Sequence, residues 1–360
     1  MELNPATLAI IYTRNAANGI ILVGIASGKV IEVPLHLVDI TTIRRVSNTK
    51  FALIASSTNT PAAIYTADIQ KFARTLLKQS TSIFVDPSIF SPAQHITFPR
   101  TQGNDPTGIA HAIIVVPHNP SFSAPAGSKP PLIVQIHGGP NAHTRLGLNL
   151  TTQYWTSRGY AYAHVNYTGS TGYGRAYQES LNGAWGIKDV DDAASCVVFL
   201  VEKGLVDGSR VGIVGKSSGG YTVLQALIHY PALFAAGSSN YGIGNLKTLA
   251  AGSHKFESHY GTALLYPRDA SAEEREKIDR ERSPCFYADK IESPLLLLQG
   301  AEDKVVPLEQ SVEMEKVMRE RGKDVKLVIF EGEGHGLRRR ENVKRAIEEE
   351  EDLWKRTLLK

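Results

Sequence analysis

The sequence of 360 residues has few cysteines, little net charge and no long apolar run. The two cysteines, Cys196 and Cys285, cannot build a disulfide framework. Because a low cysteine content is typical of proteins in a reducing compartment, we expect a cytoplasmic location. The 39 basic and 36 acidic side chains leave a formal net charge of +3, which argues against nucleic acid as a partner. No apolar stretch approaches the roughly 20 residues of a membrane span, and the N-terminus lacks the basic start of a signal peptide. We therefore expect no membrane partner.

The rest of the composition is that of a folded globular protein. Hydrophobic residues make up 42% of the chain and charged residues 21%, with 31 glycines and 18 prolines. These values exclude a disordered chain, a collagen-like chain and a coiled coil. The length is enough for two ordinary domains or for one large α/β domain with an appendage.

Residues 1–95 predict a small antiparallel β region. Short β-branched runs alternate with turn residues, and no helical periodicity occurs before Gln70. The expected strands are Leu8–Thr13, Ile20–Ala26, Lys29–Val33, Phe51–Ser56 and Ala62–Ala67. They amount to two four-stranded units at most, which is too few to close a ring.

Residues 96–360 predict a second domain in which strands alternate with helices. That order is typical of a mostly parallel sheet with helices on both faces. The expected strands are Leu132–Ile136, Ala161–Asn166, Val211–Val214, Leu295–Leu298 and Lys326–Phe330. The expected helices are Val190–Lys203, Tyr221–His229, a helix opened by the capping box Ser271-x-x-Glu274, Leu308–Arg321 and Glu341–Leu358.

A G-x-S-x-G motif lies between one of these strands and the next helix. It runs from Gly215 to Gly219, and its register makes Ser217 the candidate nucleophile. The strand–turn–helix context is that of a nucleophile elbow, in which the serine occupies a strained turn and flanking glycines permit close packing. The simpler alternative is a β–α connection rich in small residues.

A serine hydroxyl needs a base, and the base needs an orienting carboxylate. In α/β-hydrolases these follow in the chain order serine, acid, histidine, on loops after strands. Asp303 and His335 stand at two such positions, so we expect them to be the acid and the base. Glu302 and Glu333 are the rival acids: Glu302 is expected to face away, and Glu333 is too close to the histidine in sequence.

The oxyanion of an acyl-transfer intermediate needs two hydrogen-bond donors. The backbone N–H of Ser218, which follows the nucleophile, is expected to be one. The loop His137-Gly138-Gly139-Pro140 after an early strand offers the N–H of Gly139 as the other, unless that loop is only a structural turn. Together these elements predict a serine hydrolase. No cofactor is expected, and His254 and His259 lack the spacing of a metal site, so no metal is expected either.

These residues resemble the prolyl oligopeptidase family of serine peptidases, and especially its acylaminoacyl-peptidase and dipeptidyl-aminopeptidase branch. The matching blocks are 137–140, 153–177, 181–193, 215–222, 253–260, 299–307 and 330–336. The resemblance implies a triad of Ser217, Asp303 and His335 and an oxyanion hole formed by Gly139 and Ser218. It also implies an α/β-hydrolase fold capped by a β-propeller, and a small-molecule or short-peptide substrate cleaved at an amide or ester bond.

The sequence departs from the family's pattern mainly at the N-terminus, where residues 1–95 look like the last blade or two of a propeller. Three interpretations therefore stay open. The first is a peptide or ester hydrolase with a reduced gate. The second is a biosynthetic enzyme that acts on an ester, thioester or lactone, or that catalyses condensation or cyclisation in secondary metabolism. The third, an inactive binding module, is disfavoured because all triad residue types are present. Exposed sheet edges in the β region would allow a homo-oligomer.

Overall fold

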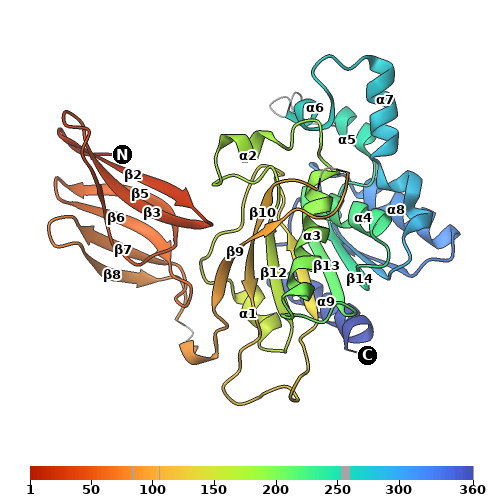
Figure 1. Cartoon of the computed structure of the whole chain (residues 1–360), viewed down its shortest axis with the longest axis horizontal. Helices are drawn as coiled ribbons and strands as arrows, with labels where there is room; N and C mark the ends of the chain where they lie inside the picture. The colour runs from red at the N-terminus through yellow and green to blue at the C-terminus, as the bar shows by residue number, and fades with distance from the viewer. Residues whose placement is uncertain (83–84, 105, 253–259, 360) are drawn as a thin grey trace. The chain divides into compact units, whose positions relative to one another are not determined.

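The computed structural model describes residues 1–82, 85–104, 106–252 and 260–359 (Figure 1). The chain divides into two compact units. Unit 1 consists of Met1–His95, Ile113–Ala126 and His143–Tyr160, and unit 2 consists of Ile96–Ala112, Gly127–Ala142 and Ala161–Lys360. The assignment of 96–360 to one catalytic domain stays a prediction. Among the described residues, no helix combines the length and apolarity that a membrane crossing requires.

Unit 1 contains two four-stranded sheets in which all neighbouring strands pair antiparallel. The first sheet consists of β1 (Glu2–Asn4), β2 (Thr7–Arg14), β3 (Ala17–Gly24) and β4 (Val30–Glu32). The second consists of β5 (Asp39–Ser47), β6 (Lys50–Ser56), β7 (Ala63–Asp68) and β8 (Ala73–Gln79). The sheets share an apolar core that includes Leu3, Ile20 and Phe51. Sequence reasoning missed β8 because all seven of its residues are exposed, so it has no apolar alternation.

The main sheet has eight strands in the order β16-β15-β14-β13-β11-β12-β10-β9. Its strands are β9 (Ala93–Pro99), β10 (Ile109–Val115), β11 (Leu132–Ile136), β12 (Ala161–Asn166), β13 (Val211–Lys216), β14 (Ala236–Asn240), β15 (Leu295–Gly300) and β16 (Val325–Phe330). Strands β11 to β16 pair in parallel, which confirms the mostly parallel sheet. Sequence reasoning missed β14, whose residues Ala-Gly-Ser-Ser-Asn are all buried although none is large and apolar.

Helices cover both faces of this sheet, as predicted. The helices of the described residues are α1 (Leu150–Thr156), α2 (Arg175–Glu179), α3 (Lys188–Glu202), α4 (Ser218–His229), α5 (Leu246–Gly252), α6 (Tyr260–Leu265), α7 (Ala272–Glu281), α8 (Leu308–Glu320) and α9 (Arg340–Leu358), with short 3₁₀ turns at Pro87–Ile89 and Pro284–Lys290. Trp354 of α9 covers Gly212 of β13, whereas Leu227 of α4 covers Gly237 of β14. Gly237 is paired with Ile213, the residue after Gly212, so the two helices lie on opposite faces. The capping box at Ser271 and Glu274 is also confirmed.

The strand order creates a switch point beside β11. The chain passes from β11 to β12 on one side and later returns through β13 on the other side. In open α/β sheets, ligands bind at the carboxyl ends of strands where the order reverses in this way. The loops that leave β11 and β13 carry the Gly138-Gly139 pair and Ser217, so the fold brings the predicted site residues to this edge.

Candidate active site

Ser217 occupies a sharp turn between β13 and α4. Its backbone has φ of 56° and ψ of −122°, a left-handed conformation that is costly for a residue with a Cβ. The Ser217 N–H donates to the carbonyl of Asn240 at 2.9 Å, which fixes the turn to the end of β14. The helix begins at Ser218 and not at Tyr221 as predicted. The glycines there permit close packing, since a Cβ on Gly219 would lie 2.3 Å from the carbonyl oxygen of Ile136.

The structure brings the side chains of Ser217, His335 and Asp303 together in a hydrogen-bonded chain. Nδ1 of His335 lies 2.8 Å from Oδ2 of Asp303, and Nε2 lies 2.9 Å from Oγ of Ser217. A carboxylate only accepts, so Nδ1 carries the proton and Nε2 presents its lone pair to the serine hydroxyl. The ring of Tyr241 packs edge-on against His335 at 4.9 Å between centroids and restricts its rotation.

Asp303 is held as a carboxylate by four hydrogen bonds. Oδ1 accepts the backbone N–H groups of Val305 and Val306, both at 2.9 Å, and Oδ2 accepts from His335 and from the buried amide of Gln299 at 3.2 Å. Burial of the carboxyl acts to raise its pKa, but the hydrogen bonds from His335 and the two amides outweigh it, so the pKa of Asp303 is lowered. Sequence reasoning did not single out Gln299.

The two rival acids, Glu333 and Glu302, make contacts other than with the ring of His335. The carboxylate of Glu333 accepts from the backbone N–H groups of Arg338 and Arg339 and from the side chain of Asn342, so it braces the loop that carries His335. Glu302 is exposed, and its backbone N–H donates to the carbonyl of Glu333. Among the described residues, Asp303 is the one of the three acids that is hydrogen-bonded to His335.

The loop after β11 lies directly against the elbow. A Cβ on Gly138 would lie 3.4 Å from the Cβ of Ser217, and Gly139 has φ of +133°, which favours glycine. The ring of His137 shapes the loop: Nδ1 donates to the Gly138 carbonyl at 2.8 Å, and Nε2 is 2.8 Å from the hydroxyl of Ser170. The hydroxyl of Tyr167 also donates to the carbonyls of His137 and Pro140. The roles of His137 and Tyr167 were missed from sequence, because they depend on contacts with a distant loop.

A buried carboxylate supports the site from behind. Oε1 of Glu350, on α9, accepts from the hydroxyl of Ser238 at 3.0 Å and from the amide of Asn240 at 3.2 Å. Burial raises the pKa of Glu350. A signal for it exists in the sequence, since helical spacing places Glu350 on the same apolar face as Ala346 and Trp354.

Two histidines for which the sequence predicts no metal site, His254 and His259, lie outside the described residues. So does most of the block 253–260 that contributed to the family resemblance. Where the chain is described, no group of three potential ligands is placed to hold a metal ion. Both cysteines are free and buried.

The model of the prolyl oligopeptidase family matches residues 147–360. The chain belongs to the prolyl oligopeptidase family. Dipeptidyl aminopeptidase BIII of Pseudoxanthomonas mexicana is 37% identical over 215 residues, which cover 59% of this chain and 31% of that protein. The acylamino-acid-releasing enzyme of Arabidopsis thaliana is 30% identical over 223 residues, 61% of this chain and 29% of that protein. The family prediction is therefore confirmed.

Solved structures extend the likeness of this family member to both units of the chain. A puromycin-hydrolysing peptidase of Mycobacterium tuberculosis matches with a TM-score of 0.90 and 32% identity over 98% of this chain and 52% of its own. A puromycin hydrolase matches with a TM-score of 0.89 and 34% identity, with the same coverage. These matches confirm the α/β-hydrolase fold with an N-terminal antiparallel β region. The chain spans about a third of the length of the two curated relatives and about half of the solved ones.

None of these four relatives is named as a biosynthetic enzyme. The comparisons therefore favour hydrolysis of peptide-like bonds over the biosynthetic alternative.

Proposed function

We propose that this chain is a serine hydrolase that cleaves the amide bond of a short peptide or aminoacyl compound through an acyl-enzyme. One observation carries the proposal: Asp303, His335 and Ser217 are linked in that order by hydrogen bonds of 2.8 and 2.9 Å, with the lone pair of the histidine facing the serine. This is the arrangement that activates a serine hydroxyl near neutral pH.

In the proposed mechanism, Oγ of Ser217 attacks the substrate carbonyl while Nε2 of His335 takes the hydroxyl proton. The carboxylate of Asp303 stabilises the resulting imidazolium. The N–H groups of Ser218 and Gly139 donate to the oxyanion of the tetrahedral intermediate. Collapse of that intermediate breaks the C–N bond, and His335 gives its proton to the leaving amine. Water then attacks the ester of Ser217 by the same steps and releases the acid.

The substrate class follows from the relatives. Their names describe release of dipeptides or acylated amino acids and hydrolysis of puromycin. We infer a small substrate of the same kind, with an aminoacyl or N-acylaminoacyl group next to the scissile bond. Esters of these groups are expected to react as well, because an alkoxide leaves more readily than an amine.

A labelling experiment tests the proposal. A fluorophosphonate probe should label the wild-type chain and fail to label Ser217→Ala, while Ser57→Ala, a serine of unit 1, serves as the control and keeps its label. Aminoacyl and N-acetylaminoacyl p-nitroanilides should be hydrolysed by the wild type and not by Ser217→Ala. Absence of labelling would restore the inactive-module interpretation. Labelling with hydrolysis of p-nitrophenyl esters but of no anilide would overturn amide cleavage.

We also propose that unit 1 mediates pairing of two copies of the chain. The edge strand β8 is exposed along its whole length and carries Leu76 and Leu77 on its surface. Unpaired strand edges with apolar residues favour addition of another strand. Light scattering after gel filtration should give a dimer that Leu77→Lys dissociates; a monomeric wild type would refute the pairing.

A reducing, cytoplasmic location is the remaining part of the proposal. Its support is that both cysteines are free and buried, so the fold needs no oxidising compartment. Fractionation of the native host, with the chain detected by antibody, tests it; recovery outside the cytoplasm would refute it.

A further inference from the structure

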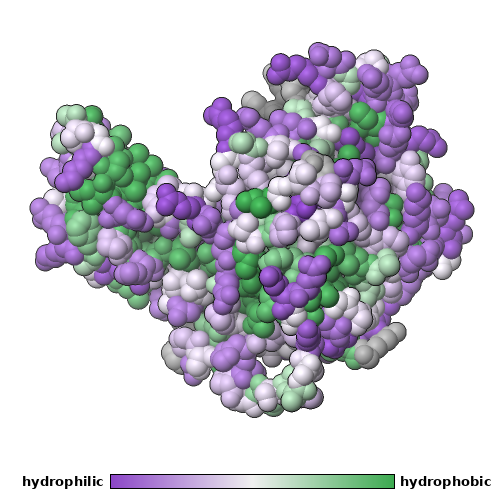
Figure 2. All heavy atoms as spheres, in the orientation of Figure 1, coloured by the Kyte–Doolittle hydropathy of each residue, from purple (hydrophilic) through white to green (hydrophobic). Residues whose placement is uncertain are grey.

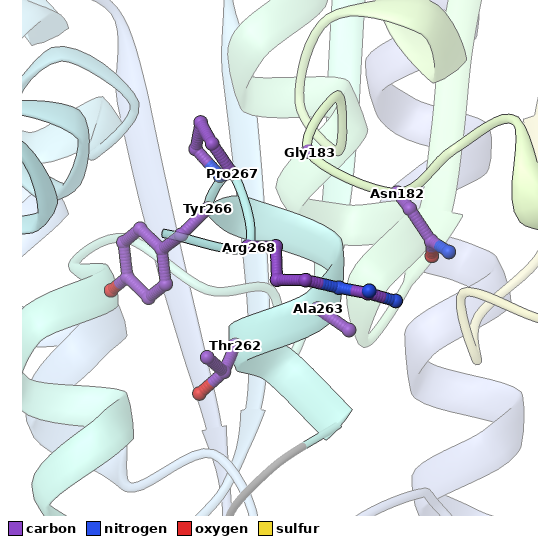
Figure 3. Close-up of a pocket in the computed structure, with 7 residues that line it drawn as sticks. All are labelled: Asn182, Gly183, Thr262, Ala263, Tyr266, Pro267 and Arg268. Atoms are coloured by element: carbon purple, nitrogen blue, oxygen red, sulfur yellow. The ribbon is translucent and has the colours of Figure 1, made fainter. Parts of the chain in front are cut away.

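Unit 2 contains a cavity of about 450 Å³ that the proposed mechanism does not use (Figure 3). The residues that line it are Asn182, Gly183, Thr262, Ala263, Tyr266, Pro267 and Arg268. One wall is the loop before α3, and the other is α6 with the turn that follows it. The two walls are joined by backbone hydrogen bonds, since Gly183 donates to Ala263 at 3.0 Å.

Both walls of the cavity are tied to Asn141, which stands two residues after the proposed oxyanion donor Gly139. The amide of Asn141 donates to the carbonyl of Gly169 at 2.7 Å, and Gly169 packs against Leu181, the residue before Asn182. On the other wall, the hydroxyl of Tyr260 donates to Oδ1 of Asn141 at 2.7 Å and accepts its backbone N–H at 3.1 Å. Tyr260 is the first residue of α6. Asn141 therefore links the oxyanion loop to the segments that carry both walls of the cavity.

The polar groups of the cavity are suited to an anion. The guanidinium of Arg268 and the amide of Asn182 are exposed, and neither side chain forms a hydrogen bond or ion pair with any residue that the structure describes. Figure 3 shows both side chains on the same side of the view, whereas the ring of Tyr266 points the other way. The hydroxyl of Tyr266 donates to Asp279. None of the seven lining residues is acidic.

We propose that this cavity binds a carboxylate of the substrate while the scissile carbonyl lies at Ser217. The inference rests on the proposed function and names its substrate class, which is short peptides or acylated amino acids that carry a carboxylate away from the scissile bond. Arg268 pairs with the carboxylate through two N–H groups, and Asn182 donates a further hydrogen bond. The carboxylate is either the free C-terminus of a peptide or an acidic side chain.

Matched substrates separate these two sources. The first pair is one peptide with a free C-terminal carboxylate and with a C-terminal amide; the second pair is an amidated peptide with Glu and with Gln at the same position. If the cavity binds the carboxylate, then in one of the two pairs the member with the carboxylate should have a kcat/KM about ten times that of its neutral partner, mainly because its KM is lower. Wild-type enzyme that does not discriminate within either pair would overturn the inference.

Variants of Arg268 assign the effect to the cavity. Arg268→Gln should remove the tenfold preference for the carboxylate substrate and leave kcat/KM on the neutral substrate unchanged. Arg268→Glu should invert the preference, so that a peptide with a C-terminal amine is favoured. The control is Arg321→Gln, an exposed arginine at the end of α8, beside the amino ends of the strands. An equal loss on both members of a pair would show a structural role and overturn the inference.

Two measurements keep this result distinct from failure of the proposed function. The neutral fluorophosphonate probe should label wild type and Arg268→Gln at equal rates, so labelling without substrate discrimination refutes the cavity alone. Calorimetry with Ser217→Ala gives a readout without catalysis: the carboxylate peptide should bind about ten times more tightly than its amide, and the added Arg268→Gln change should abolish that difference. Equal binding of the two peptides would refute the inference even in an inactive chain.

Discussion

The side-chain amide of Asn240 donates to the buried carboxylate of Glu350, and the backbone carbonyl of the same asparagine accepts the N–H of Ser217. The next residue, Tyr241, packs against the ring of His335. A carboxylate on the last helix therefore anchors the end of β14, and that strand end contacts two members of the proposed triad.

Removal of the Glu350 carboxylate should lower activity. Glu350→Leu leaves the hydroxyl of Ser238 and the amide of Asn240 without their acceptor in a buried space, at a cost of about 1–3 kcal/mol for each group. We expect a lower kcat and a lower melting temperature, and recovery of both in Glu350→Gln, which keeps an acceptor oxygen. The matched control is Glu348→Leu on the exposed face of α9. An unchanged kcat in Glu350→Leu would contradict the anchoring role.

Replacement of Asp303 by asparagine should lower kcat by about 10³-fold or more with little change in KM. The asparagine amide donates toward Nδ1 of His335, which favours the tautomer whose Nε2 carries a proton and cannot accept from Ser217. Steady-state kinetics on an anilide test this. A loss of less than tenfold would mean that another group orients the histidine.

Asp303 should also make the stability of the fold sensitive to acid. The folded-state pKa of Asp303 is lowered below its ordinary value of 3.8, so its contribution to stability is full above that value and is lost as the pH falls through the folded-state pKa. Urea unfolding below pH 4 should therefore show a steeper loss of stability for wild type than for Asp303→Asn. Parallel curves for the two proteins would contradict the lowered pKa.

The contribution of Asp189 to stability should have the opposite pH dependence. Burial raises its pKa to about 6, while hydrogen bonds from Thr222 and Gly186 act against the rise. Its folded-state pKa lies above the unfolded value, so its contribution is full below about pH 4 and is lost as the pH rises through 6. The stability of wild type relative to Asp189→Asn should fall between pH 4 and pH 7 by up to about 3 kcal/mol. Chemical unfolding at both pH values measures this change, and a rise would contradict it.

The elbow glycine should not tolerate even one methyl group. Gly219→Ala would place Cβ 2.3 Å from the backbone oxygen of Ile136, so the strand and the helix must separate. We expect a loss of several kcal/mol in stability, together with loss of fluorophosphonate labelling. The control is Gly261→Ala in α6, where a Cβ meets nothing within 4 Å and alanine should stabilise the helix by about 0.5–1 kcal/mol. Similar stabilities for the two variants would contradict this account.

The family, the fold class and several strand positions could be predicted from the sequence because each has a local signal. The buried strands β11 and β12 have the predicted bounds, since an uninterrupted apolar run marks a strand covered on both faces. The polar strand β14 has no such signal, because its serines and asparagine are buried by pairing with groups distant in sequence.

In the candidate site, too, the residues with a local sequence signal could be predicted, whereas the residues that hold them in place could not. Chain order and strand-end loops predict the positions of Ser217, Asp303 and His335, and the structure places their side chains in hydrogen-bonding contact. The residues that hold them, such as Gln299 and Glu350, look like ordinary members of a strand and a helix. Helical spacing does mark Glu350 as a carboxylate on an apolar face. The hydrogen-bond partners of both residues, however, become evident only when the chain is folded.

The left-handed backbone of Ser217 determines which substitution would be favoured at this position if the chain were selected for folding but not for catalysis. Glycine adopts that conformation without steric cost, so Ser217→Gly relieves strain and adds stability while it removes the hydroxyl. Mutational drift under selection for folding alone would therefore erase the serine. A hydroxyl kept at this position is a stability penalty that only its reactivity offsets.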